Sequence, residues 1–214
     1  MIKAVIFDVD GVILESVDIK TNAFGELFNK YAKHKEAIVA YHKQNLGISR
    51  YVKFRYIYER ILGLPLSKKL EKQLGKRFSD LVLRKVLRSS LVPGALKFLR
   101  AYHKKYFFFI ASGTPVKELK FILKQKKLDK FFRRIYGSPK QKTDILLDIL
   151  SRGHFKKKEV VFVGDASTDY QAARQTGVHF IFREASLYRN LEVRYRLKNL
   201  EQLSRVIARI SMNT

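Results

Sequence analysis

The chain has 214 residues, 46% of them hydrophobic, which is enough apolar material for one large domain or for a core with a small insertion. It contains no cysteine, and this excludes disulfide bonds, thiolate metal sites and cysteine nucleophiles. The formal net charge is +25, with basic residues spread along the whole chain rather than gathered in one tail. We interpret this charge as a general basic bias that draws anionic substrates to the protein; nucleic-acid binding is the less favoured alternative.

The chain opens on an apolar run without the basic and small-residue pattern of a secretory signal. Its longest apolar runs, such as residues 106–111, are too short to span a bilayer. We therefore expect a soluble, cytoplasmic protein without a membrane partner, either a monomer or a dimer.

The first predicted element is a buried strand at residues 2–8, which runs into Asp8-Val9-Asp10-Gly11. Residues i and i+2 of a strand share a face, so the two carboxylates need a cation, a proton or a donor between them. An ordinary turn is the alternative, since Asp and Gly favour turns. The position at the carboxyl end of a strand, where open α/β sheets bind ligands, favours a divalent-metal site with a reactive carboxylate.

Residues 16–89 have a helical pattern throughout, with breaks near Gly47 and at residues 63–65. A helix opens after residues 92–94, and then strands and helices alternate. The strands are predicted at 106–111, 134–136, 159–163 and 178–182, and the helices at 116–126, 143–152, 168–176 and 201–210. This alternation predicts an α/β protein with a parallel sheet, in which residues 1–15 and 90–214 form the core. Residues 16–89 are then an all-helical cap inserted over the strand ends.

Polar residues follow three more of the predicted core strands. Ser112-Gly113-Thr114 follows the second strand, Lys140 and Lys142 the third, and Asp165 and Asp169 the fourth. Carboxylates without histidine or cysteine suit Mg²⁺, and a hydroxyl, backbone amides and a lysine suit a phosphate. The combination predicts phosphoryl transfer. Taken alone, Ser112 is also consistent with a helix cap, and Asp169 with a first-turn acid that complements the helix dipole.

These four motifs, in this order at predicted strand ends, resemble those of the haloacid dehalogenase-like hydrolases. The helical insertion resembles the cap of the phosphoglycolate phosphatase and β-phosphoglucomutase group, and the resemblance implies a Rossmann-like core. It further implies that Asp8 is the nucleophile that forms an aspartyl-phosphate and that Asp10 moves protons. Mg²⁺ would be bound by Asp8, Asp165 and Asp169, the last directly or through water, and by the backbone carbonyl of Asp10. Ser112 and the Gly113 amide would hold the phosphoryl group, and Lys142, with Lys140 as the alternative, would neutralise it.

The cap selects the substrate in this family, and residues 47–50 resemble its specificity loop. We therefore predict that Arg50 binds a second anionic group of the substrate, assisted by Lys53; a solvent-facing basic helix is the alternative. Lys20 stands where the mutase branch has a histidine, which disfavours a mutase, and Glu15 replaces an aspartate near the hinge. Lys53 also leaves open the Schiff-base chemistry of a phosphonate-cleaving branch. The five histidines are interpreted as surface or packing residues.

The sequence thus predicts a Mg²⁺-dependent phosphatase that hydrolyses a small anionic phosphomonoester, such as phosphoglycolate or a sugar phosphate. Three alternatives stay open. They are a phosphatase of nucleotide or polynucleotide ends, a β-phosphoglucomutase-like phosphotransferase, and a non-catalytic phosphate-binding module.

Overall fold

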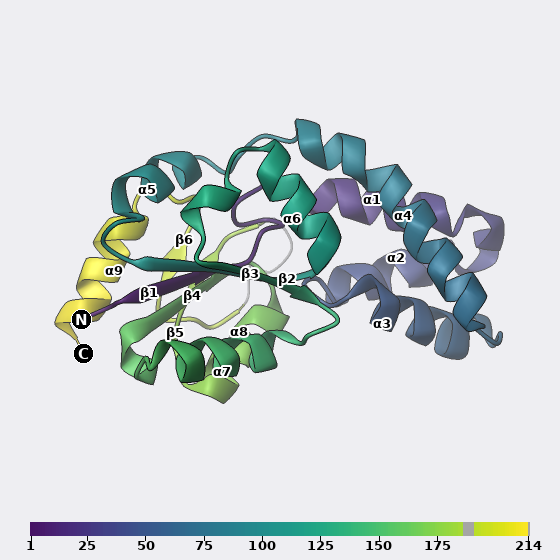
Figure 1. Ribbon diagram of the computed structural model, residues 1–214. Helices are drawn as coiled ribbons and strands as arrows, with labels where there is room; N and C mark the ends of the chain where they lie inside the picture. The colour runs from purple at the N-terminus through teal and green to yellow at the C-terminus, as the bar shows by residue number, and fades with distance from the viewer. Residues whose placement is uncertain (186–190, 214) are drawn as a thin grey trace.

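The computed structural model describes residues 1–185 and 191–213. At its centre lies a six-stranded parallel sheet in the order β3-β2-β1-β4-β5-β6 (Figure 1). The strands are β1 (Ala4–Phe7), β2 (Phe107–Pro115), β3 (Arg134–Ser138), β4 (Val160–Gly164), β5 (His179–Arg183) and β6 (Arg196–Leu197). Because the strands run in one direction, the loops after β1, β2, β3 and β4 meet at one edge of the sheet.

The two faces of the sheet are covered by different helices because successive residues of β1 point to opposite sides. Val5 and Phe7 pack in the core that also contains residues of α5 (Ala95–Tyr102), α6 (Val116–Gln125) and α9 (Leu203–Met212). Ala4 and Ile6 pack with residues of α7 (Lys142–Gly153) and α8 (Ser167–Thr176). The predicted α/β fold, with a Rossmann-like parallel sheet between helical layers, is confirmed.

A helical region, residues 16–89, follows β1 and lies beyond the carboxyl ends of the strands (Figure 1). It contains α1 (Val17–Leu27), α2 (Lys35–Gln44), α3 (Arg50–Tyr56) and α4 (Lys68–Arg88), and a π turn at Ile57–Leu62 continues α3. The Phe24 ring of α1 lies 5.8 Å from the Phe54 ring of α3 and 4.7 Å from the Phe78 ring of α4, between centroids. We call this region the cap and the rest of the chain the core, following the predicted division.

The observed elements depart from the predicted bounds at a few places. Strand β2 continues to Pro115, which pairs with Ser138 of β3 after a shift in register. The last helix begins at Leu203 rather than at residue 201. The sequence pattern does not predict β6, because two residues are too few to show a periodicity. Short 3₁₀ turns occupy Asn29–His34, Asp129–Phe131 and Lys157–Glu159. Among the described residues, no helix is both long and apolar enough to cross a membrane.

Candidate active site

Three buried carboxylates meet where β1 and β4 end. Asp8 follows β1, Asp165 follows β4, and Asp169 lies in the first turn of α8. One carboxylate oxygen from each lies within 4.8 Å of the others. The parallel arrangement of the central strands therefore brings together three acids that are far apart in the sequence.

The donor set and the space at this cluster fit a magnesium ion. Asp165 Oδ2 is buried and has no hydrogen-bond partner within the described residues, so one acidic oxygen lacks the donor that a buried acceptor normally has. Gly11 leaves room beside it, since a Cβ there would lie 2.2 Å from this oxygen. Clustered carboxylate oxygens suit a hard divalent cation such as Mg²⁺.

Two acids of the cluster, Asp8 and Asp165, have pKa values raised above that of a free carboxyl. Burial is the main cause that raises the pKa of Asp8 to about 7; Asp169 and Asp10 add to it, and Lys142 opposes it. The pKa of Asp165 is raised well above its usual value, first by burial and then by the charges of Asp8 and Asp169. Positive charge placed between the acids lowers these pKa values again, because it stabilises the ionised carboxylates.

Lys142 supplies part of that positive charge from the start of α7. Its Nζ donates to Asp8 Oδ2 at 2.6 Å and to Asp169 Oδ1 at 2.5 Å. Burial alone would lower the pKa of Lys142, but the two carboxylates raise it above its usual value. Lys140 points elsewhere: its side chain is 40% exposed and its ammonium lies 3.2 Å from Asp148. The geometry thus gives Lys142, and not Lys140, access to the acidic cluster.

Asp10 has a separate set of partners and does not belong to the three-acid cluster. Ser16 Oγ donates to its Oδ1 at 2.6 Å, and Thr114 Oγ1 donates to its Oδ2 at 3.2 Å. The Lys20 ammonium forms a very short ion pair with Oδ2 and also donates to Thr114 Oγ1 at 2.7 Å. Burial alone would raise the pKa of Asp10, but Lys20, Ser16 and Thr114 outweigh it and lower the pKa. The two aspartates of the first motif therefore lie in different electrostatic settings.

The carboxyl-terminal part of β2 itself, rather than the loop predicted to follow it, brings a hydroxyl and closely approaching backbone to the same edge. Ser112 is buried, and its Oγ accepts a hydrogen bond from the Thr114 backbone N–H at 3.2 Å. Gly113 lies against the cap, because a Cβ at this residue would be 2.3 Å from the carbonyl oxygen of Gly47. Only a residue without a side chain allows this approach of core and cap.

The cap is closed over the strand ends by further contacts. Thr168 Oγ1 of α8 donates to the Leu46 carbonyl oxygen at 2.8 Å. The buried Arg50 guanidinium forms a bidentate ion pair with Glu118 of α6, with distances of 2.6 and 3.0 Å. It also donates to Ser79 Oγ at 2.7 Å. The pair between Arg50 and Glu118 joins α3 of the cap to α6 of the core, whereas Ser79 belongs to α4 of the cap itself.

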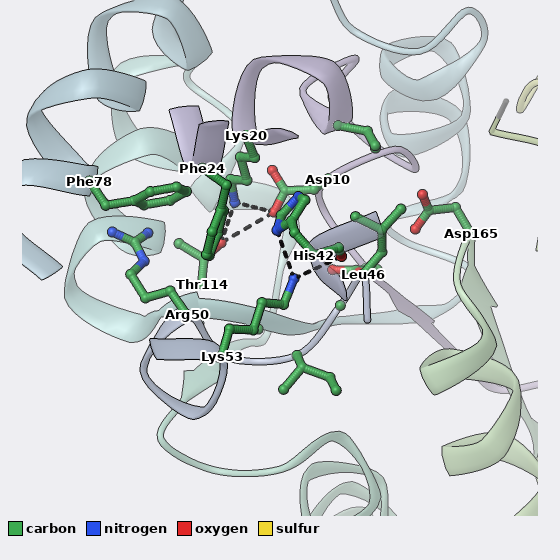
Figure 2. A pocket seen from close by; sticks show the side chains of 15 residues that line it. Asp10, Lys20, Phe24, His42, Leu46, Arg50, Lys53, Phe78, Thr114 and Asp165 are labelled. Carbon is green, nitrogen blue, oxygen red and sulfur yellow. Dashed lines mark hydrogen bonds and ion pairs between the residues drawn. The ribbon is translucent and has the colours of Figure 1, made fainter. Parts of the chain in front are cut away.

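A pocket remains between the cap and the acidic edge of the core (Figure 2). Asp8, Asp10 and Asp165 line its core side. Lys20, His42 and Lys53 line it from the cap. The pocket therefore combines carboxylates of the core with cationic and neutral donors from the cap, and such donors can bind an anionic group.

A family model described as haloacid dehalogenase-like hydrolase matches residues 5–182 of the chain. This match spans both the cap and the strands that carry the site. The chain belongs to the haloacid dehalogenase-like hydrolase family. The resemblance read from the four motifs is confirmed by this match.

Relatives of this hydrolase are similar along most of their length. A phosphorylated carbohydrates phosphatase from Thermotoga maritima is 23% identical over 186 residues, which cover 84% of both proteins. A β-phosphoglucomutase structure from Clostridium difficile has a TM-score of 0.79 at 19% identity and covers 100% of this chain and 99% of its own. CbbY from Rhodobacter sphaeroides, solved in complex with xylulose-(1,5)bisphosphate, has a TM-score of 0.76 at 15% identity, with 95% and 96% covered. The two structural similarities establish the fold.

The hydrolase brings most of its predicted site residues to the pocket edge. Asp8, Asp165 and Asp169 form one cluster that Lys142 contacts. The carboxylate of Asp10 lies apart from this cluster. The metal contact predicted for Asp10 was through its backbone carbonyl and not through its carboxylate. Arg50 lines the pocket, but its guanidinium is paired with Glu118. A substrate anion would have to compete with that carboxylate.

Several residues with clear roles were not singled out from the sequence. Thr114 donates a hydrogen bond to Asp10, Thr168 donates one to the backbone of the cap at Leu46, and His42 is buried in the pocket wall. Arg183 of β5 forms an ion pair with Glu15 at 2.5 Å, beside the first motif. Their partners are distant in sequence or lack a motif spacing. Thr114 is the exception, because it directly follows Ser112 and Gly113 and belongs to the same motif.

Proposed function

We propose that this hydrolase is a Mg²⁺-dependent phosphatase that cleaves a small phosphomonoester through an aspartyl-phosphate on Asp8. The observation that carries the proposal is the setting of Asp8. Its carboxylate is buried beside two further acids and hydrogen-bonded to Lys142. Asp10, two residues away, is held apart from the cluster by its own donors. This arrangement supports one carboxylate that attacks and one that moves protons.

The first step transfers the phosphoryl group to the protein. A carboxylate oxygen of Asp8 attacks phosphorus, the bond from phosphorus to the ester oxygen breaks, and Asp10 gives its proton to the departing oxygen. Asp10 must be protonated for this step, and the negative charge of the arriving phosphate favours that form. Lys142 and the Gly113 amide would stabilise the negative oxygens of the group in transfer.

The second step regenerates the enzyme. Asp10 takes a proton from a water molecule, the water oxygen attacks phosphorus, and the bond to Asp8 breaks to release inorganic phosphate. Asp8, Asp165 and Asp169 would hold Mg²⁺, which supplies positive charge to the phosphoryl oxygens when it is bound. Lys20 and Thr114 keep the Asp10 carboxylate oriented toward the pocket between the two steps.

A phosphorylated carbohydrate is the proposed substrate class. The Thermotoga maritima relative carries that activity in its name, and CbbY was solved with a sugar bisphosphate. The pocket supports the same class, because carboxylates of the core and lysines of the cap lie around one space between the two. Phosphoglycolate stays a second proposed substrate of the same chemistry.

The test is phosphate release from a panel of sugar phosphates with Mg²⁺ and with EDTA. We expect release that depends on Mg²⁺ and that Asp8→Asn abolishes. Asp80→Asn is the matched control, since Asp80 is exposed on α4. Release that survives in Asp8→Asn would refute the assigned nucleophile, and no release from any ester would refute the phosphatase.

A further inference from the structure

Lys53 is a buried lysine without an acidic partner. Its side chain extends from α3 into the pocket (Figure 2), and the residue is only 2% exposed. Its Nζ contacts His42 Nδ1 at 3.1 Å and the His42 carbonyl oxygen at 3.4 Å. No carboxylate within the described part of the chain forms an ion pair with it. Buried lysines normally have such a partner, because an isolated charge is costly away from water.

His42, the neighbour of Lys53, has one ring nitrogen without a hydrogen-bond partner. Because the Lys53 ammonium has only protons to offer, it donates to Nδ1, and the neutral ring then carries its proton on Nε2. Nε2 is buried and has no hydrogen-bond partner among the described residues. The ring lies against Phe24, with 4.1 Å between centroids, so its environment is apolar. In the wall of one pocket the cap thus presents one buried donor without an acceptor, the His42 Nε2–H, and one buried ammonium without an anionic partner, that of Lys53.

The lowered pKa of Lys53 indicates that its ammonium lacks an anionic neighbour. Burial, followed by the charges of Lys20 and Lys142, lowers the pKa of Lys53 to about 7, and Asp10 opposes this only weakly. An anionic oxygen beside the ammonium would reverse the effect of the two other lysines. The Phe24 ring, 5.3 Å from Nζ, offers only a weak substitute.

Arg50, the other buried cation of the cap, already has an anionic partner. Its guanidinium is engaged by both oxygens of Glu118 and by Ser79, and it lies over the Phe78 ring. In the cap, all of whose residues are described, two buried cations therefore line the pocket; the charge of Arg50 is neutralised by a carboxylate of the core, and that of Lys53 is not.

We propose that Lys53, with His42 beside it, binds an anionic oxygen on the alcohol part of the substrate. This rests on the proposed phosphatase function and narrows it: the preferred substrate is a phosphate ester whose alcohol carries a second anion, a carboxylate or a phosphate. The phosphoryl group to be transferred faces Asp8 and Lys142. The second anion faces Lys53 across the pocket.

The experiment compares two matched substrate pairs. Phosphoglycolate and ethyl phosphate differ by a carboxylate, and fructose 1,6-bisphosphate and fructose 1-phosphate differ by the distal phosphate. For each pair, the preference is the ratio of kcat/KM for the ester with two anions to that for the ester with one. We expect wild type to prefer the two-anion ester in at least one pair, and the identity of that pair distinguishes carboxylate from phosphate.

Lys53→Met removes the charge but keeps the length of an apolar chain that suits its buried site. We expect it to reduce the preference by about 10- to 100-fold, the loss expected for one charge-assisted hydrogen bond. Lys72→Met, at an exposed residue of the same cap, is the control and should retain the preference. Lys53→Arg should retain part of the preference, which keeps the test decisive if Lys53→Met folds poorly.

A binding measurement separates this inference from the proposed function. Calorimetry on Asp8→Asn with Mg²⁺ should show tighter binding of the two-anion member of the preferred pair, and Lys53→Met in that background should remove the difference. If turnover is absent but this difference appears, the phosphatase proposal fails and the anion site stands. A preference that is unchanged in Lys53→Met, or absent from wild type in both assays, would overturn the site. Borohydride reduction of an imine between the Lys53 amine and the ketone of fructose 1-phosphate would also overturn the proposed anion site. A covalent adduct at Lys53 would mean that its amine attacks a carbonyl instead of binding an anion.

Discussion

The ion pair between Arg50 and Glu118 is predicted to control closure of the cap rather than choice of substrate. Both residues are largely buried, and the pair forms only when α3 of the cap meets α6 of the core. Glu118→Gln removes the negative charge and leaves the guanidinium with Ser79 and the Phe78 ring. Breaking one partner of a buried pair costs about 3 kcal/mol at the lower end of the usual range.

That cost falls on the closed state, because an open cap exposes the guanidinium to water. A shift of about 3 kcal/mol in the closing equilibrium corresponds to a loss of about 150-fold in kcat/KM if the whole cost falls on that equilibrium. The loss should be the same for esters with one anion and with two, since every substrate needs the closed pocket. The assay is kcat/KM on both kinds of ester, together with hydrogen exchange in α3 and α6.

Two further variants sharpen this prediction. Glu71→Gln is the matched control, because Glu71 pairs at 2.7 Å with Arg55, an exposed residue of the same cap, and an exposed pair contributes little. Arg50→Met combined with Glu118→Gln should be less impaired than Glu118→Gln alone, since no buried charge is then left unpaired. A loss confined to two-anion esters would refute the reasoning and make Arg50 a substrate ligand.

Further predictions concern the acidic cluster. Lys142→Met should lower kcat by about 100-fold or more through the lost stabilisation of transferring charge, whereas Lys140→Met should stay close to wild type; equal losses in steady-state kinetics would reject the assignment. Gly11→Ala should weaken Mg²⁺ binding measured by calorimetry, because its Cβ would lie 2.2 Å from Asp165 Oδ2 and its φ is +76°. In the metal-free protein, Asp8 has a pKa raised to about 7, so its contribution to stability is present below about pH 4 and lost as the pH rises through 7. In thermal unfolding without metal, the melting temperature of wild type should therefore fall over that range relative to that of Asp8→Asn, and Mg²⁺ should reduce this fall; identical pH profiles of the two proteins in EDTA would contradict the buried cluster.

The sequence predicts the fold and the acidic cluster well because both follow from local patterns. Apolar runs that alternate with helical stretches predict a parallel sheet, and such a sheet places its strand ends at one edge. Asp8, Asp165 and Asp169 could therefore be grouped without knowledge of their distances. The sequence favours Lys142 over Lys140 without excluding the latter, and the structure shows the difference directly, since the Lys142 ammonium contacts Asp8 and that of Lys140 lies near Asp148.

The partners of the two buried cap cations, Arg50 and Lys53, could not be predicted from the sequence. Arg50 and Glu118 are 68 residues apart, and nothing in either segment indicates that they meet. Lys53 and His42 are 11 residues apart on different helices, and a lone histidine among apolar residues suggests packing. Long-range packing of the cap against the core decides which cation is neutralised, and this is where the predicted role of Arg50 and the structure diverge.

The most direct test of the account is detection of the phosphorylated aspartate. Wild-type protein mixed with Mg²⁺ and a sugar phosphate is quenched in acid during turnover, and its peptides are analysed by mass spectrometry. We expect a phosphoryl group on Asp8 that hydroxylamine removes and that is absent from Asp8→Asn. Turnover in wild type with Asp8 unmodified under rapid quenching, together with retained activity in Asp8→Asn, would contradict the proposed mechanism.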